Sequence, residues 1–549
     1  LRSNKENKNN RKKLSVTNAR LQDSALRMEA YLKLFINRNL VQIEKAEKYK
    51  KQLLKMLNGS TSCEKIKQAI GKKTKAIVCT HASNVTGDGN DIAQIGTLCK
   101  KYNLYFILDA SQTAGTIEID MEQNHISAIC FTGHKGLFGP QGTGGIALAD
   151  GVCVKPLLSG GSGVHSFERK HPMELPAALE AGTLNGHGIA GLHAALDWIK
   201  KTGIAAIHEK EMALAEQFQR GIETIPGIHI YGGEKRVAAI VSCNLADLDS
   251  TYVSDCLAEN YGIATRAGAH CAPQIHTHFG TEKQGMVRFS FSCFNTTEEV
   301  EKAVRAMQDI AAENRGKVTA YVGAGGKTSS IRKRAETLRA EGKRVLILTT
   351  TKMMVPQEQE IFIAYEQTGQ ESVISATASV WQERRAAEKQ LKERVQSVLD
   401  TYGCCVAGSL IPGTEKFGML PEKLMEDLLY LADEILIEAD GSAHMPVKAP
   451  AEHEPVLFPY MDEVVIVMGA HAIGKPLREV CHRVDYAKEL LKCDADKIVT
   501  AADLKTLAEQ GYAIPIQKQY PWMKISKVTG KDIKLCLTAE KKDKERDKQ

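Results

Sequence analysis

The sequence predicts an α/β protein in which two sheet-based halves follow one another along 549 residues. Three short apolar runs, at 75–81, 104–110 and 126–133, alternate with helical patterns, as buried parallel strands and their crossover helices do. A second alternation of this kind starts at 318, after a predicted linker at 311–317. Its further predicted strands are "RVLILTTT" (344–351), "DEILIEAD" (433–440), "EVVIVMG" (463–469) and "DKIVTA" (496–501). Several domains are expected, because a chain of this length exceeds one ordinary hydrophobic core.

Charge and composition argue against a nucleic-acid binder and a membrane protein. The net charge is +6, and residues 1–55 carry +10 of it through fifteen Lys/Arg and five Asp/Glu, which leaves −4 for the remainder. The basic character therefore belongs to the N-terminal segment. No apolar run reaches the roughly 20 residues of a membrane span, and no secretory signal is visible. Fourteen scattered cysteines predict reduced thiols and a cytoplasmic protein.

The elements of the first half follow in order. Residues 21–57 show helical periodicity with many lysines, which predicts a solvated helix; a basic RNA-binding or membrane-surface arm is the alternative. After the three strands, residues 188–222 predict a long helical stretch. An α+β portion then carries the runs "VAAIVSCNL", "GIATRAG" and "GMVRFSFSCFN", and a helix near 297–313 ends it.

Polar residues follow each of the three buried strands. His81 and Asn84 follow the first, Asp109 ends the second with Gln112 close behind, and the third leads into Thr132, His134 and Lys135. Ligands of open α/β sheets bind beyond the carboxyl ends of the strands, so these side chains are expected to converge. A desolvated lysine can form a Schiff base and an aspartate can pair with a pyridinium nitrogen, which together predict a pyridoxal phosphate site. A surface lysine and a helix-capping aspartate are the alternative.

Residues 59–313 resemble the class V aminotransferase fold, and specifically the cysteine desulfurase and selenocysteine lyase family. The matching motifs are "THASNVTG" (80–87), "LDASQTAG" (108–115), "FTGHKGLFGPQGTGG" (131–145), "LEAGTLN" (179–185), "RAGAHCA" (266–272) and "VRFSFSCFNT" (287–296).

This resemblance implies a role for each matching residue. Lys135 would form the Schiff base with pyridoxal 5'-phosphate. The other cofactor contacts would come from His81 and Asn84 beside the ring, Asp109 at its nitrogen, Gln112 at its hydroxyl, Thr132 and His134 at the phosphate, and Thr183 from the second subunit of a homodimer. Arg288, with Arg266 nearby, would bind the carboxylate of a cysteine or selenocysteine substrate.

Cys271 would then be the nucleophile that takes sulfur or selenium from the substrate. His270 and Arg266 are placed to favour its thiolate and, with Lys135, complete the catalytic set. Two alternatives stay open at this point. Cys271 could be an inert buried thiol, or it could bind zinc together with His276 and His278.

The residues before "THASNVTG" do not resemble the first part of the family's fold. The expected organisation is therefore a basic, atypical segment at 1–58, a partial cofactor-binding large domain at 59–200, a small α+β domain at 201–313, a second α/β domain at 314–535, and a charged tail at 536–549.

The second half opens with a glycine-rich loop. "VGAGGKTSS" (322–330) follows a predicted strand and begins a helix, so its backbone amides are expected to cradle phosphate. Lys327 would neutralise phosphate, and Thr328 could bind magnesium. In "ILIEADGS" (435–442), Glu438 and Asp440 lie at the end of a predicted buried strand, where a carboxylate, with Asp440 the chosen candidate, would hold magnesium; a solvated strand end is the alternative. The nucleotide-binding set is Gly323, Gly325, Gly326, Lys327 and Thr328. A full P-loop spacing would need glycine at Tyr321, so the loop is the shorter G-x-x-G-K-T; a simple glycine turn is the alternative.

Further motifs of this half are "KAPAEHEPVLFP" (448–459), "GAHAIGKPL" (469–477) and "CHRVD" (481–485). With the loop, they resemble the selenium-dependent hydroxylase accessory protein family (YqeC) over about 317–535. The resemblance implies a P-loop-like domain that binds ATP or GTP with magnesium and helps a molybdenum hydroxylase mature. Lys448, His453 and Arg483 are candidates for a second site.

The two halves together predict a bifunctional protein: a desulfurase-like enzyme that mobilises sulfur or selenium for an acceptor protein, joined to a nucleotide-binding maturation factor. Two other functions stay open. The first half could be a degenerate module in a protein that acts only as a nucleotide-dependent accessory factor, or it could be an aminotransferase or another lyase.

Overall fold

The computed structural model describes residues 63–161, 167–168, 170–356, 360–365 and 378–530, and it divides into two compact units, Leu1–Ile310 and Ala311–Gln549. The predicted N-terminal helix at 21–57 and the charged tail at 536–549 lie outside the described residues. None of the helices in the described ranges is long and apolar enough to cross a membrane.

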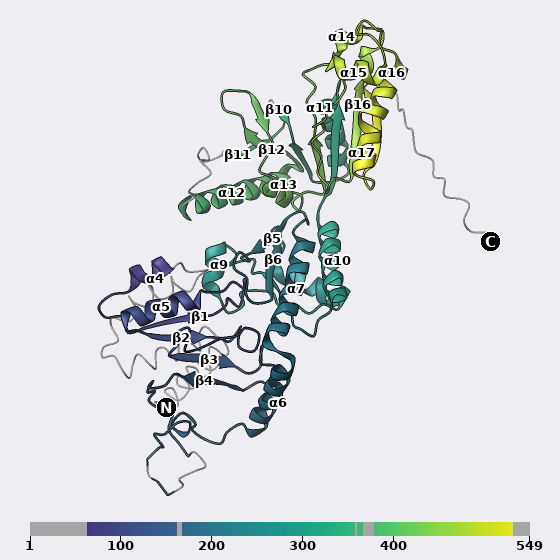
Figure 1. Ribbon diagram of the computed structural model, residues 1–549. Helices are drawn as coiled ribbons and strands as arrows, with labels where there is room; N and C mark the ends of the chain where they lie inside the picture. The colour runs from purple at the N-terminus through teal and green to yellow at the C-terminus, as the bar shows by residue number, and fades with distance from the viewer. Residues whose placement is uncertain (1–62, 162–166, 169, 357–359, 366–377, 531–549) are drawn as a thin grey trace, which may run out of the picture. The chain divides into compact units, whose positions relative to one another are not determined.

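The first unit begins with a four-stranded sheet in the order β1-β2-β3-β4 (Figure 1). Its elements are α4 (Cys63–Ala69), β1 (Ala76–Thr80), α5 (Ile92–Tyr102), β2 (Tyr105–Asp109), β3 (Ala128–Thr132) and β4 (Gly144–Leu148). The first three strands are parallel and β4 runs antiparallel to β3. Asp91 caps α5 by accepting a hydrogen bond from the Gln94 amide, as an N-cap aspartate should. The three apolar runs predicted as strands are therefore confirmed.

Two helices and a second sheet complete this unit. The predicted helical stretch at 188–222 is two helices, α6 (Gly186–Thr202) and α7 (Ile204–Ile222), because Gly203 between them adopts a φ of 90°. A three-stranded antiparallel sheet has the order β5-β6-β7. Its elements and flanking helices are β5 (Ile228–Tyr231), β6 (Ile240–Leu245), α8 (Ser250–Tyr261), α9 (Pro273–Phe279), β7 (Val287–Ser290) and α10 (Thr297–Asn314). The predicted linker at 311–317 is wrong, since α10 is helical to Asn314 and a strand begins at Lys317.

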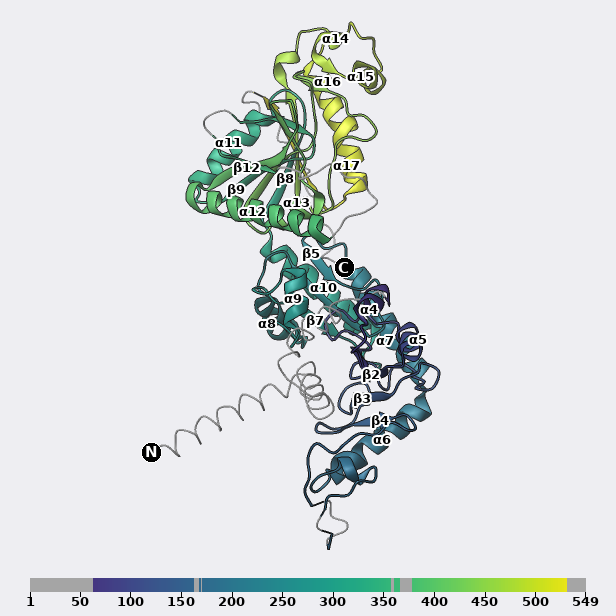
Figure 2. The same cartoon turned by 90° about the vertical axis from the view of Figure 1, so that its left-hand side faces the viewer.

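The second unit is built on a nine-stranded sheet with the order β10-β13-β12-β9-β14-β8-β16-β18, to which β11 adds beside β12 (Figure 2). Its first part comprises β8 (Lys317–Gly323), α11 (Lys327–Ala340), β9 (Val345–Thr349), β10 (Lys352–Met354), β11 (Phe362–Tyr365), α12 (Ala378–Tyr402), β12 (Cys404–Leu410), β13 (Lys416–Gly418), α13 (Glu422–Leu428) and β14 (Glu434–Glu438). Only the short β10 and β13 run antiparallel to their neighbours.

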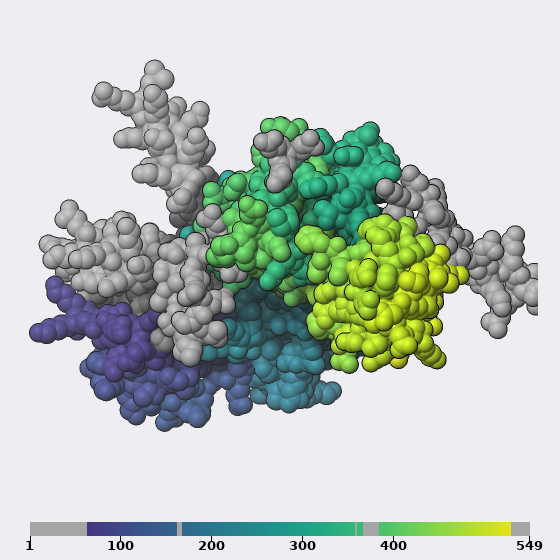
Figure 3. Space-filling view, turned by 90° about the horizontal axis from the view of Figure 1, so that it is seen from above, coloured from purple at the N-terminus to yellow at the C-terminus, as the bar shows by residue number. Residues whose placement is uncertain are grey.

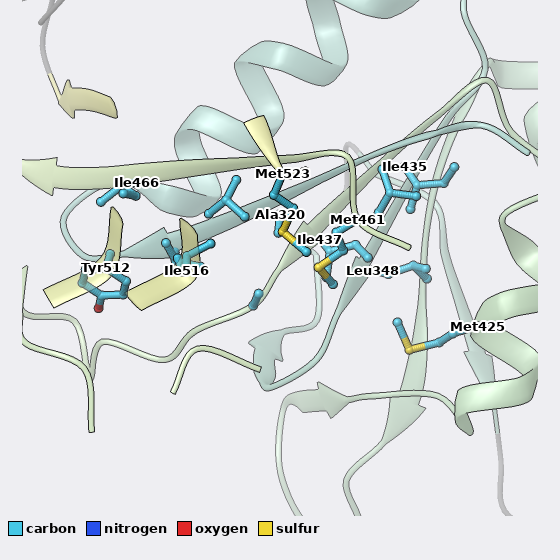
Figure 4. Close-up of a cluster of buried hydrophobic side chains, with 14 of the residues drawn as sticks. Ala320, Leu348, Met425, Ile435, Ile437, Met461, Ile466, Tyr512, Ile516 and Met523 are labelled. Atoms are coloured by element: carbon cyan, nitrogen blue, oxygen red, sulfur yellow. The ribbon is translucent and has the colours of Figure 1, made fainter. Parts of the chain in front are cut away.

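Successive apolar side chains along these strands point alternately to the two faces of the sheet and so form two hydrophobic layers. Leu346 and Leu348 of β9 join Ile435 and Ile437 of β14 in the larger core, beneath α12 and α13. Met461, Ile466, Tyr512, Ile516 and Met523 continue that core (Figure 4). The intervening residues Val345, Ile347 and Leu436 face α11 on the other side. Because successive side chains of a strand point to opposite faces, near-continuous apolar strands need a helix layer on each side.

The remaining elements follow β14 in the chain, and two of them, β16 and β18, end the nine-stranded sheet beside β8; the last part of the chain that the structure describes is yellow in Figure 3. They are β15 (Val447–Lys448), β16 (Glu463–Gly469), η3 (Ala470–Ala472), α14 (Leu477–Val480), β17 (Cys481–His482), α15 (Val484–Leu491), α16 (Ala501–Thr506), η4 (Leu507–Ala513), α17 (Ile514–Gln519) and β18 (Lys524–Gly530). The predicted strand "DKIVTA" (496–501) is wrong: only Ile498 forms an isolated bridge, to Pro476, and Thr500 caps α16 through a capping box.

Candidate functional sites

The carboxyl ends of β1 and β2 bring His81 and Asp109 together. Thr80 and Asp109 are register partners, and the His81 amide donates a 2.8 Å hydrogen bond to the Asp109 carbonyl. The Asp109 carboxylate accepts from the Ser111 amide at 2.9 Å, which orients it at the strand end. The His81 ring is buried with Nδ1 at 2.9 Å from the Thr113 hydroxyl, and burial lowers the pKa of His81 to about 4. The His81 imidazole is therefore neutral near pH 7.

The loop after β3 carries Lys135 to the same edge of the sheet. The Thr132 hydroxyl and His134 Nδ1 lie 2.8 Å apart, so the two predicted phosphate ligands contact each other. The half-buried Lys135 is held in a turn by a hydrogen bond from the Phe138 amide to its carbonyl, 2.8 Å. This loop packs tightly against the loop after β2: a Cβ at Gly115, where φ is 90°, would lie 2.3 Å from the Gly136 carbonyl oxygen. Glycine at 115 therefore permits the close approach of the Lys135 and Gln112 loops.

A second group connects the loop after β1 to β7. The Asn84 side-chain amide donates to the His270 carbonyl at 2.7 Å, and Arg288 Nη1 donates to the Asn84 carbonyl at 2.8 Å. Arg266 pairs with Arg288 as an isolated bridge, and its Nη2 lies 3.4 Å from Cys271 Sγ. The predicted substrate arginines and the predicted nucleophile are therefore gathered at one place in the first unit.

The backbone around Cys271 is unusual. His270 and Cys271 have φ values of 50° and 60°, a region that non-glycine residues seldom occupy outside constrained turns. His270 is buried, its Nε2 is 2.9 Å from the Arg266 carbonyl, and burial lowers the pKa of His270 to about 4. His270 is consequently neutral near pH 7, so the positive charge beside the Cys271 thiol comes from the arginines and not from this imidazole.

Other predicted residues of this unit have less defined surroundings. Gln112 lies half-buried in the turn after β2, and Thr183 is exposed in the loop before α6; their cofactor contacts stay predictions.

The zinc alternative for Cys271 is not supported, because within the described ranges no group of three or more His, Cys, Asp or Glu side chains could hold a metal ion. Thr113 belongs to the site at the strand ends and was missed by sequence reasoning, since a threonine in a turn gives no signal of its own.

In the second unit, the glycine-rich loop joins β8 to α11 as the sequence predicts. Gly323, Gly325 and Gly326 all have positive φ, and a Cβ at Gly325 would lie 2.3 Å from the Pro446 carbonyl oxygen. Lys327 is buried in the first turn of α11, where its ammonium donates to the Gly323 carbonyl at 2.7 Å. Burial lowers the pKa of Lys327, which Glu438 and Asp440 oppose. The loop thus folds over its own lysine at a helix N-terminus.

Two carboxylates face this loop: Glu438, the last residue of β14, and Asp440, which follows the strand. The Thr328 hydroxyl donates to Glu438 at 2.9 Å, and the Gly323 amide donates to Asp440 at 3.0 Å. Asp440 is completely buried and also pairs with Lys448 and the Tyr512 hydroxyl. Magnesium binding by Thr328 and Asp440 stays a prediction; the carboxylate that Thr328 contacts here is Glu438.

Lys448 is the centre of a buried ionic network. It is fully buried and contacts Asp440, the Gly441 carbonyl at 2.5 Å, and Glu454 at 2.8 Å. Glu454 in turn pairs with Arg483 at 3.0 Å. Of the residues suggested for a second site, Lys448 and Arg483 are therefore brought together. Tyr512 was missed because it lies 72 positions from Asp440 and in no recognisable motif.

Comparison with known proteins finds similarities for both parts of the chain. Residues 37–303 match the family model "Aminotransferase class-V", which begins earlier than the predicted start at 59, and residues 319–485 match the family model "YqeC protein". A probable cysteine desulfurase of Methanothermobacter thermautotrophicus is 33% identical over 252 residues, which cover 45% of this chain and 63% of that protein. A cysteine desulfurase of Shigella flexneri is 31% identical over 258 residues, covering 46% and 62%.

The solved structures that resemble the chain include the apo cysteine desulfurase of Thermococcus onnurineus NA1, with a TM-score of 0.43, 29% identity, and coverage of 47% of this chain and 64% of that one. The chain spans less than two thirds of the length of these desulfurases. Both family resemblances predicted from the motifs are confirmed: residues 37–303 match the class V aminotransferase model and are similar to cysteine desulfurases, and residues 319–485 match the YqeC protein model.

Proposed function

We propose that the first unit uses pyridoxal 5'-phosphate to remove sulfur from cysteine, or selenium from selenocysteine, and that the second unit binds ATP or GTP with magnesium to support the maturation of a selenium-dependent molybdenum hydroxylase. The gathering of Arg266, Cys271 and Arg288 carries the first part, since it sets a half-buried thiol beside guanidinium groups. The guanidinium groups would hold a substrate carboxylate within reach of the thiol.

The donor set at the strand ends fits pyridoxal phosphate. Asp109 would pair with the ring nitrogen, Lys135 would hold the cofactor covalently, and Thr132 with His134 would bind its phosphate. His81, Asn84 and Gln112 would surround the ring, and Thr183 would contribute from the second copy of a homodimer. The buried His270 Nδ1 and Arg288 Nε have no hydrogen-bond partner among the described residues, which is consistent with a site built for a polar ligand. When bound, the cofactor supplies an electron sink for bonds at the α-carbon of an amino acid.

The residues of this chain then have separate tasks. Arg288 binds and orients the substrate carboxylate, and Lys135 moves protons at the substrate carbons. The Cys271 thiolate attacks the substrate sulfur; an S–S bond forms while the carbon–sulfur bond breaks, and the bonding pair stays with the substrate carbon, which takes up a proton. Cysteine and a thiol give alanine and a Cys271 persulfide, so atoms and electrons balance without an external oxidant or reductant. Selenocysteine would leave a selenosulfide.

The experiment that tests this proposal begins with absorption spectra of the purified chain, with and without pyridoxal phosphate, beside Lys135→Ala. A visible band of lysine-bound cofactor is expected only when Lys135 is present. Cys271→Ala should keep the band and lose the ability to form a persulfide, which is measured by alkylation and mass spectrometry. The control is Cys256→Ala, which changes a half-buried cysteine of α8 and should still form the persulfide.

Full persulfide formation in Cys271→Ala would contradict the assigned nucleophile. A keto acid in place of alanine would favour an aminotransferase. Absence of the band from folded protein, together with nucleotide binding that Lys327→Ala abolishes, would favour an accessory factor acting through its second unit alone.

The nucleotide site rests on the loop of the second unit. Gly325 lets the loop approach Pro446 closely, Lys327 stands at the start of α11, and Thr328 contacts the Glu438 carboxylate at 2.9 Å. A helix N-terminus with a lysine and a hydroxyl suits phosphate and its magnesium. Isothermal titration with ATP and GTP, each with and without magnesium, tests this part, and Lys327→Ala should abolish the binding.

A further inference from the structure

Tyr512 lies far from the glycine-rich loop in sequence yet shares a hydrogen-bond acceptor with it. Its side chain is completely buried, and its hydroxyl donates to Asp440 Oδ2 at 2.7 Å. The same oxygen accepts the Gly323 amide at 3.0 Å. Burial raises the pKa of Tyr512 well above its usual value, so the hydroxyl keeps its proton and acts as the donor. Asp440 therefore connects the last residue of β8 to the C-terminal helices.

The backbone that presents Tyr512 is π-helical. Leu507–Ala513 interrupts a continuous helical run between α16 and α17 with a π-helix. π-Helices are rare, and those that interrupt α-helices occur frequently at functional sites. A change of one residue in helical register would rotate the following side chains by about 100°. The π-helical register thus determines whether the Tyr512 hydroxyl faces Asp440.

Gly323, where the connection from Tyr512 through Asp440 reaches the glycine-rich loop, has a tightly constrained backbone. Gly323 has a φ of 92°, and a Cβ there would lie 2.2 Å from the Val467 carbonyl oxygen. The Lys327 ammonium donates to the Gly323 carbonyl, so Gly323 is held through its amide by Asp440 and through its carbonyl by the loop lysine. Lys448 neutralises Asp440 from the other side. A change at Asp440 should therefore move the backbone on which the loop begins.

We propose that Tyr512 is a positioning residue for the glycine-rich loop, acting through Asp440, and that the π-helix Leu507–Ala513 couples occupancy of the loop by a nucleoside triphosphate to the C-terminal helices. This inference rests on the proposed nucleotide site. Coupling of this kind is reciprocal: if the helix orders the loop, a bound nucleotide must also order the helix. Tyr512 would not touch the nucleotide itself.

The test compares the whole chain with Tyr512→Phe and Tyr460→Phe. Tyr460 is a matched control, because it is a buried tyrosine of the same unit whose hydroxyl has no hydrogen-bond partner among the described residues. Titration with ATP and GTP in the presence of magnesium should show binding weakened roughly tenfold in Tyr512→Phe, as expected for losing a hydrogen bond to a charged group. Tyr460→Phe should bind as the wild type does.

Hydrogen exchange provides a second measurement, because its dependence on nucleotide would not change if Tyr512 had a purely structural role. A saturating nucleotide should slow amide exchange across residues 501–519 in the wild type and in Tyr460→Phe, and should do so much less in Tyr512→Phe. Wild-type affinity together with unchanged nucleotide-dependent protection in Tyr512→Phe would overturn the inference while leaving the nucleotide site standing. Failure of the wild type to bind either nucleotide would overturn the site, and this inference with it.

Discussion

The Thr328 hydroxyl donates a 2.9 Å hydrogen bond to Glu438 Oε2 and so joins the first turn of α11 to the end of β14. Glu438 is buried, and burial raises its pKa against the opposing effects of Lys327 and Thr328. The strand that leads into α11 through the glycine-rich loop is β8, and β8 is a direct neighbour of β14 in the sheet. A hydroxyl and a carboxylate in contact beside a lysine form a site that a magnesium ion carried by a nucleotide could enter.

Glu438→Gln tests this relationship. It keeps the shape of the side chain and the hydrogen bond but removes the charge, so the gain in ATP affinity that magnesium provides should fall about tenfold or more, while binding in EDTA should change little. Titration calorimetry with and without magnesium measures both. Glu463→Gln is the control. Glu463 is the first residue of β16, at the end of the sheet opposite to the glycine-rich loop, and it pairs with Lys317. If Asp440→Asn alone removed the effect of magnesium, Asp440 would be the ligand and Glu438 would not.

Lys448→Met should destabilise the second unit strongly. The substitution leaves Asp440 and Glu454 without their shared buried cation, and breaking a buried ion pair in this way costs about 3–5 kcal/mol. Urea unfolding followed by tryptophan fluorescence and circular dichroism gives the free energy of unfolding. Lys488→Met, which removes a solvent-exposed pair with Asp485, should have a much smaller effect. Equal losses in the two variants would mean that the network contributes no more than a surface pair.

Acid should remove the stability that two buried neutral histidines, His81 and His270, contribute to the first unit. Burial lowers the pKa of His81 and of His270 to about 4, whereas an unfolded histidine titrates near 6.5. Between these values an unfolded histidine binds more protons than the folded one, so the contribution of each histidine to stability falls as pH falls from about 6.5 to 4, by up to about 1.4 kcal/mol per pH unit. Burial raises the pKa of Glu211 to about 7, which offsets part of this loss because the folded chain takes up that proton first. Above that window the two histidines contribute no pH dependence.

Urea unfolding at several pH values checks this expectation. His81→Gln should flatten the slope, and His193→Gln, an exposed histidine of α6 near Asp197, should leave it unchanged. An equal slope in wild type and His81→Gln would show that His81 is not held neutral by the fold.

Local patterns accounted for much of what the structure contains. The strands ending at Thr80, Asp109 and Thr132 were predictable because apolar runs of about five residues between helical patterns have few other solutions. The loop from Gly323 to Thr328 was predictable because its glycines adopt backbone conformations that other residues avoid. The strand predicted at 496–501 failed because an apolar pair within a polar turn resembles a short strand, while β18, with alternating lysines, gave too weak a signal.

The residue types at each strand end and the resemblance to two families were readable from the sequence, since these depend on short motifs within one segment. Which side chains meet across long separations became clear only from the three-dimensional fold. Arg288 reaches Asn84 over 204 positions, and Tyr512 reaches Asp440 over 72. Such contacts depend on sheet order, strand register and helical register together, and an error of one residue in any register would point the side chain elsewhere. The charge around Cys271 and the buried environment of Lys448 therefore come from the fold.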